Sequence, residues 1–178
     1  STAGEADVAS VSQINRATVL LADSSVTVSA FKANVAALAP SRTVTYGNSI
    51  DRNSYAFDSS IAVERSSIRV LRAPRGANVA SMLSTEPGFG LLRSGVAVSD
   101  TTVKIAASAG HVNVASLQTS EATSTTLSLV VSNVTSHVGA TGPVMLASAV
   151  APFAVSTTVS VAGCQMASTS AQTGCVRF

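Results

Sequence analysis

The residue types that most often carry out catalysis are scarce in this chain. Its 178 residues include 2 His, 2 Cys and 9 carboxylates, and no Trp. Ser29 and Lys32 have the spacing in which a lysine can activate a serine, but that chemistry needs a helical serine and a Lys-Thr-Gly segment, which the chain lacks. His111 or His137 could join a Ser-His-Asp triad with Asp100, yet no Gly-x-Ser-x-Gly accompanies them. We therefore predict that the chain is not an enzyme.

Motifs that hold metals or phosphates are missing from the sequence as well. Gly88-Phe89-Gly90 is followed by Leu91-Leu92-Arg93, which fits neither the dinucleotide nor the Walker pattern. The acidic residues stand singly, although acids from two subunits could still meet and hold Ca²⁺ at an interface. Two cysteines without a histidine cluster do not make a zinc site. We expect no cofactor, no metal site within the chain and no small-molecule substrate.

Cys164 and Cys175 enclose a short C-terminal segment. One interpretation is a disulfide that closes a small loop, worth ~2–3 kcal/mol in the chain-entropy model. The other is a pair of reduced, partly buried thiols that pack as small apolar side chains. The sequence leaves both interpretations open.

The basic residues concentrate in one stretch, which suggests a possible contact with phosphate. Of 11 basic residues, four are Arg65, Arg69, Arg72 and Arg75. Arginine binds phosphate with two parallel hydrogen bonds, so these four, with Arg16, are candidates for contacts with a nucleic-acid backbone. No aromatic residue is interleaved to stack on bases, so we expect no reading of base sequence. The alternative is a solvated strand face whose charges pair with acidic neighbours.

Strict alternation of valine with hydroxyl residues predicts that β-strands position all of these groups. The segment Ser25-Val26-Thr27-Val28-Ser29-Ala30-Phe31 is the clearest case, because at period two its apolar side chains share one face. Turn residues such as Asp23-Ser24 and Ala73-Pro74-Arg75-Gly76 separate the runs. The predicted strands are 17–22, 25–31, 42–46, 54–64, 67–71, 95–99, 101–107, 111–117, 126–134, 143–149 and 153–162.

This pattern predicts an all-β fold. We expect a jelly-roll-like β sandwich of about eight to ten antiparallel strands. One or two short helices are expected at Ala33–Leu38 and Asn78–Leu83. We divide the chain into an N-terminal arm, residues 1–16, and a single β-sandwich domain, residues 17–178. No tandem repeat is apparent.

The low content of charge favours a surface that is covered by other molecules. Charged residues make up 11% of the chain, against about 25% in an ordinary soluble domain. Either hydroxyls hydrate the surface, or much of it is buried against neighbouring subunits, since interface cores are poor in charge. A net charge of +2 demands neither a nucleic-acid nor a membrane partner. No apolar run reaches the roughly 18 residues of a transmembrane helix.

One segment adds a family resemblance to this reasoning. Residues 153–166, Phe-Ala-Val-Ser-Thr-Thr-Val-Ser-Val-Ala-Gly-Cys-Gln-Met, resemble the final strand of small jelly-roll coat proteins of positive-strand RNA viruses. The charge-poor, Ser/Thr-rich composition is similar to coats of the tymovirus kind. The resemblance covers about a tenth of the chain. The resemblance implies a self-assembling capsid subunit in a virion. Such a subunit would form a large homo-oligomer and contact the backbone of the viral RNA.

The alternative that the residues support is a second kind of structural protein. It is an extracellular β-sandwich subunit of a pilus, an adhesin or a surface layer, in which Cys164 and Cys175 form a real disulfide.

Overall fold

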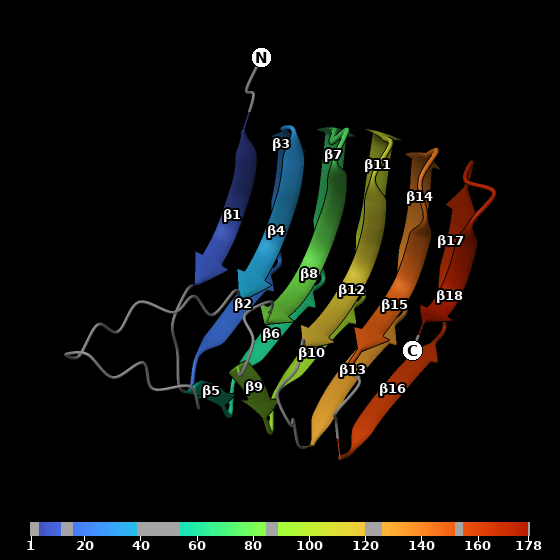
Figure 1. Ribbon diagram of the computed structural model, residues 1–178. Coiled ribbons are helices and arrows are strands. Elements are labelled where there is room, and N and C mark those ends of the chain that lie inside the picture. The colour runs from blue at the N-terminus through green and yellow to red at the C-terminus, as the bar shows by residue number, and fades with distance from the viewer. Residues whose placement is uncertain are drawn as a thin grey trace.

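The computed structural model of the protein describes residues 4–11, 16–38, 54–84, 89–119, 126–151 and 155–177. These residues form 18 strands and no helix, which confirms the all-β prediction. Every strand pair among them is parallel. The expected jelly-roll-like β sandwich of antiparallel strands is therefore wrong, and the chain instead winds into a β-solenoid (Figure 1).

The solenoid has three parallel sheets, and each coil contributes one strand to each of them, so that strands of successive coils lie next to each other. The first sheet contains β2 (Thr18–Ala22), β6 (Ser60–Glu64), β10 (Gly95–Ser99), β13 (Leu127–Ser132) and β16 (Thr157–Ala162). The second sheet contains β3 (Ser25–Ser29), β7 (Ser67–Arg72), β11 (Thr102–Ser108), β14 (Thr135–Ala140) and β17 (Gln165–Ser168). The third sheet contains β1 (Glu5–Val11), β4 (Lys32–Leu38), β8 (Gly76–Ser84), β12 (His111–Thr119), β15 (Val144–Val150) and β18 (Thr173–Arg177). A short pair, β5 (Ser54–Phe57) and β9 (Phe89–Leu92), completes the set.

Aliphatic ladders fill the interior between the sheets. Along the first sheet, for example, Val63, Val98 and Val131 stand at the same position of successive coils, and each is 0% exposed. The alternation seen in the sequence is real in the first two sheets, where strands such as β6, β7, β10 and β13 turn one face to this core and the other outward. Alternation is typical of antiparallel sheets with one exposed face, and this explains why the strands were recognised while their parallel partners were not.

A column of left-handed residues turns the chain from the first sheet to the second. The φ angles in this column lie between 45° and 51° at Asp23, Arg65, Asp100 and Asn133. Gly163 continues the column with a φ of 63°. A second such column, at the entry to the first sheet, contains Arg16, Asp58, Arg93 and Thr126. Left-handed geometry is unusual for residues other than glycine, and its recurrence at the same position of each coil marks it as the device that makes the corner.

Buried hydroxyls stabilise the corner between the first two sheets. The Ser66 hydroxyl donates to the carbonyl of Glu64 (2.7 Å) and accepts the N–H of Ser24 from the coil before it (3.2 Å). Thr101 repeats this arrangement one coil later, donating to the carbonyl of Ser99 (2.7 Å). Backbone groups at a buried corner must find partners, and these side chains supply them.

An asparagine ladder runs along the third sheet. Asn113 Nδ2 donates to Asn78 Oδ1, and Asn78 Nδ2 donates to Asn34 Oδ1, both at 3.0 Å. Asn34 Nδ2 in turn donates to Asp7 Oδ1 on β1 (2.8 Å). The ladder ends where Met145 takes the same position in the next coil.

The two expected helices are strands. Ala33–Leu38 lies in β4 and Asn78–Leu83 lies in β8, because stacking pairs both segments in register and ties them through the asparagine ladder. Both are short, and short helices gain little on their own, so tertiary pairing decides the structure. Within the expected N-terminal arm, residues 5–11 form β1, which pairs with β4. The strand predicted at 42–46 lies outside the described residues.

The repeat that the sequence analysis did not find is also clear in the structure. The stacked positions Ser25, Ser67, Thr102, Thr135 and Gln165 follow one another at intervals of 42, 35, 33 and 30 residues. The unequal intervals hide the repeat from inspection. The signal that remains is Asn-Val-Ala, which recurs at 34–36, 78–80 and 113–115.

Candidate functional site

The arginines singled out in the sequence do not form one patch. Arg65 stands at a corner and makes two hydrogen bonds to the carboxylate of Asp23, each 2.8 Å, and one to Glu64 (3.2 Å). The Asp23 partner raises the pKa of Arg65, and the Arg65 hydrogen bond lowers the pKa of Asp23. Arg16, whose side chain is 84% exposed, lies 3.8 Å from Asp58 at the other corner. Acidic neighbours thus balance both of these arginines.

The other three arginines differ from these and from one another. Arg75 lies at the corner between the second and third sheets, with its guanidinium 5.3 Å from the centre of the Phe31 ring. Arg72, at the end of β7, lines a small hollow beside that corner. Arg69 alone of the five projects from the middle of a strand, on the outer face of the second sheet.

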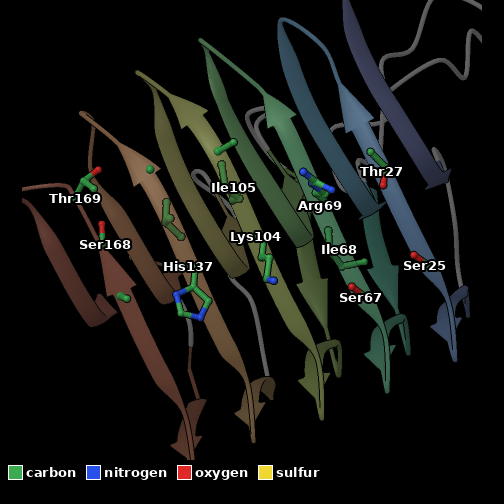
Figure 2. Close-up of a pocket in the computed structure, with 14 residues that line it drawn as sticks. Ser25, Thr27, Ser67, Ile68, Arg69, Lys104, Ile105, His137, Ser168 and Thr169 are labelled. Carbon is green, nitrogen blue, oxygen red and sulfur yellow. The ribbon is translucent and has the colours of Figure 1, made fainter.

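A shallow groove of 810 Å³ runs across that outer face. It crosses all five strands of the second sheet, from Ser25 and Thr27 on β3 to Ser168 at the end of β17 (Figure 2). Neighbouring strands lie about 4.8 Å apart, so the four steps between the five strands span roughly 19 Å. Hydroxyl groups line both ends of the groove, and the basic groups lie between them.

Three nitrogen-bearing side chains form a row in the middle of the groove, which we call the basic row: Arg69, Lys104 and His137. Arg69 pairs with Lys104, and Lys104 pairs with His137, in the register of adjacent strands, and all three are exposed. The five strands of this sheet contain no Asp or Glu. Like charges directly opposite each other destabilise a sheet, so Arg69 beside Lys104 works against folding.

The corners treat charge in the opposite way. From one coil to the next, the side-chain charge at a corner alternates between positive and negative, as it does for Arg16, Asp58 and Arg93 at the entry to the first sheet. Arg93 Nε lies 2.6 Å from Asp58 Oδ1, and this hydrogen bond lowers the pKa of Asp58 and raises that of Arg93. The basic row therefore differs from these two corners, where the described arginines Arg16, Arg65 and Arg93 each have an acidic neighbour.

Sequence reasoning did not connect Lys104 and His137 with Arg69, because each stands alone in its own stretch of chain. A usable signal existed, since Arg69, Lys104 and His137 each come two residues after the first residue of their strand. Reading it requires the coil repeat to be known first.

The two ends of the solenoid form a second feature. The first and last coils leave their inward-facing side chains half-buried, including Val26 and Val28 at one end and Val159, Val161 and Met166 at the other. In the middle coils the corresponding side chains are almost all fully buried. The outermost strands of the first two sheets are β2 and β3 at one end and β16 and β17 at the other, and none contains a charged residue or a proline.

The cysteines and the histidine-based candidates do not assemble into a site. Cys164 and Cys175 are both free thiols in the structure, the first at a corner and the second on β18. The Cys164 thiol contacts the carbonyl of Ala162 at 3.2 Å. Asp100 accepts a hydrogen bond from Asn133 Nδ2 at 3.0 Å. Among the described residues, no three His, Cys, Asp or Glu side chains gather as metal ligands would.

The described part of the chain has no helix that could cross a membrane. No protein-family model, no curated protein and no solved structure matches this chain.

Proposed function

We propose that this chain is a structural subunit that stacks end to end with copies of itself. The observation that carries the proposal is the pair of open ends, at which the edge strands of the first two sheets carry no charge. Each end presents the open edge of three parallel strands, namely β1, β2 and β3 at one end and β16, β17 and β18 at the other. An exposed strand edge is a template for pairing with another chain.

The usual protections against such pairing are weak in the first two sheets, whereas β1 and β18 of the third sheet contain Glu5, Asp7 and Arg177. Soluble β-proteins commonly guard an edge with lysine, proline, a bulge or an inward-pointing charge. The strands β2, β16 and β17 carry none of these residues, and a single irregularity lies at Val28/Ser29 in β3. The half-buried Val161 and Met166 would gain burial from a further coil stacked on them.

A rod that joins at its ends favours a filament or a layer over a closed shell. The expectation of a capsid in a virion stays a prediction, but the part of it that rested on a jelly-roll strand loses its basis, because the described strands form a parallel solenoid. An extracellular or cell-surface subunit of a pilus, an adhesin or a surface layer remains consistent with a rod whose outer faces are rich in hydroxyls. We also maintain, as a prediction, that the chain is not an enzyme.

The test is sedimentation velocity over a range of protein concentrations. The wild type is expected to form larger species as concentration rises, because head-to-tail contacts do not close. Val161→Lys places a charge inside the last coil and should leave the protein monomeric. Ser99→Lys adds the same charge to the side of a middle coil and should associate as the wild type does. A single 17.8 kDa species of the wild type at every concentration would refute the proposal.

Mixing two blocked variants tests the head-to-tail arrangement itself. Val28→Lys blocks the first coil and leaves the last coil open, whereas Val161→Lys does the reverse. Each alone should remain monomeric, and an equimolar mixture should stop at dimers. Circular dichroism establishes that both variants retain the wild-type β content.

A further inference from the structure

We infer that the groove on the second sheet binds a linear anionic polysaccharide, with the basic row of Arg69, Lys104 and His137 contacting its acidic groups. This inference is independent of end-to-end stacking, because the groove lies on the side of the rod and the stacking surfaces lie at its ends.

The first argument is the uncompensated charge. Stacked corner residues alternate in sign, so Asp23 and Arg65 pair directly, yet on the second sheet Arg69 and Lys104 are neighbours with no acidic residue on any strand of the sheet. Such a pair costs stability. The basic row departs from the charge pairing seen at the corners, and such a departure at an exposed position is expected where a residue serves a function.

The second argument is the shape of the groove. Its cations lie along the axis of the solenoid, across adjacent strands, so their spacing follows the strand spacing of about 4.8 Å. A ligand that neutralises them must carry acidic groups along its length. Guanidinium and ammonium groups bind carboxylate and sulfate through charge-assisted hydrogen bonds, and the exposed imidazole adds an N–H donor.

The third argument concerns the groups that flank the basic row. The described groove residues include Ser25, Thr27 and Ser67, whose hydroxyls can donate to and accept from sugar hydroxyls. No Phe, Tyr or Trp lines the groove, and stacking of bases on such rings is a major contribution to the binding of single-stranded nucleic acid. The lining therefore favours a polysaccharide over RNA.

The experiment measures binding of a size-defined heparin oligosaccharide by fluorescence titration of a labelled oligosaccharide. The same titration is repeated with labelled poly(U) RNA and with labelled neutral dextran, which serve as ligands for comparison. All titrations are run at a protein concentration at which sedimentation shows monomers, so that stacking does not contribute. We expect heparin to bind, with an affinity that falls as salt is raised, and dextran not to bind.

Matched variants locate the site. Arg69→Ser and Lys104→Ser should each weaken heparin binding about tenfold, the loss expected from one charge-assisted contact. Lys104→Arg keeps the charge and should retain binding. Arg16→Ser removes the same charge from a corner outside the groove and should leave binding within about twofold.

A stability measurement separates function from structure. Lys104→Ser removes a like-charge neighbour, so its midpoint in urea should equal or exceed that of the wild type while its heparin binding is weakened. The inference is overturned if no heparin binds, if Arg16→Ser weakens binding as much as Lys104→Ser does, or if poly(U) binds the groove more tightly than heparin.

Discussion

The coil geometry predicts how the cost of a single core substitution depends on position along the rod. Val63, Val98, Val131 and Val161 occupy the same place in successive coils of the first sheet. The first three are 0% exposed, and Val161, in the last coil, is half-buried. Replacing each by alanine removes the same atoms from the same kind of site, so the differences report only on what covers that site.

The expected magnitudes follow from this burial. Valine to alanine removes the equivalent of two methylene groups, about 1.6 kcal/mol at about 0.8 kcal/mol each, and the cavity left in a rigid ladder adds to this. We expect a loss of roughly 2–3 kcal/mol in the free energy of unfolding for Val63→Ala, Val98→Ala and Val131→Ala. Val161→Ala should cost roughly 1 kcal/mol or less, because water already reaches that side chain.

The assay is urea unfolding followed by far-ultraviolet circular dichroism at monomeric concentrations. Coils of a solenoid interact mainly with their neighbours and can unfold separately, so native-state hydrogen exchange should accompany it. A cost for Val161→Ala equal to that for Val98→Ala would refute the open last coil. A spread of several kcal/mol among the three middle variants would refute the equivalence of their sites, and with it the register of the first sheet.

Three further predictions concern the polar devices of the fold. Asn78→Ala should lower the free energy of unfolding by about 1–3 kcal/mol, measured in urea, because it removes the acceptor of Asn113 Nδ2 and the donor to Asn34 Oδ1 together. Arg65 lowers the pKa of Asp23 in the folded state, so the carboxylate stabilises the protein above the unfolded pKa of about 3.9 and loses this effect as pH falls through the lower folded pKa. The difference in unfolding free energy between the wild type and Asp23→Asn should therefore vanish in acid. A difference that persists in acid would contradict the pairing of Asp23 with Arg65. Thr126 is a β-branched residue at a φ of 53°, so Thr126→Gly should raise the melting temperature, whereas Thr102→Gly, in regular β11, should lower it.

Sequence reasoning located strands well where the pattern is local. The prediction for 95–99 coincides with β10, and those for 17–22 and 67–71 differ from β2 and β7 by one residue. It failed for 33–38 and 78–83, where alanine-rich segments read as short helices but pair as strands β4 and β8. It also read 54–64 as one strand, although Asp58 turns the chain there with a φ of 50°.

The candidate site was only partly accessible from the sequence. Arg69 was singled out for its position in an arginine-rich stretch, but Arg65 and Arg75 lie at corners of the fold and Arg72 lies at the end of the same strand. Its actual neighbours on the basic row are Lys104 and His137, which are 35 and 68 residues further along the chain. No local pattern connects residues so far apart.

The sequence by itself determined that this protein is built of strands, that its core is aliphatic and that its surface is poor in charge. These properties depend on the alternation and types of neighbouring residues, which act within a few positions of one another. The tertiary structure alone decided that the strands run parallel, which residues stack, and that two cations meet in a groove. Parallel stacking joins residues 27 to 44 positions apart, and left-handed corners that turn the chain without reversing it select that partner over the adjacent strand.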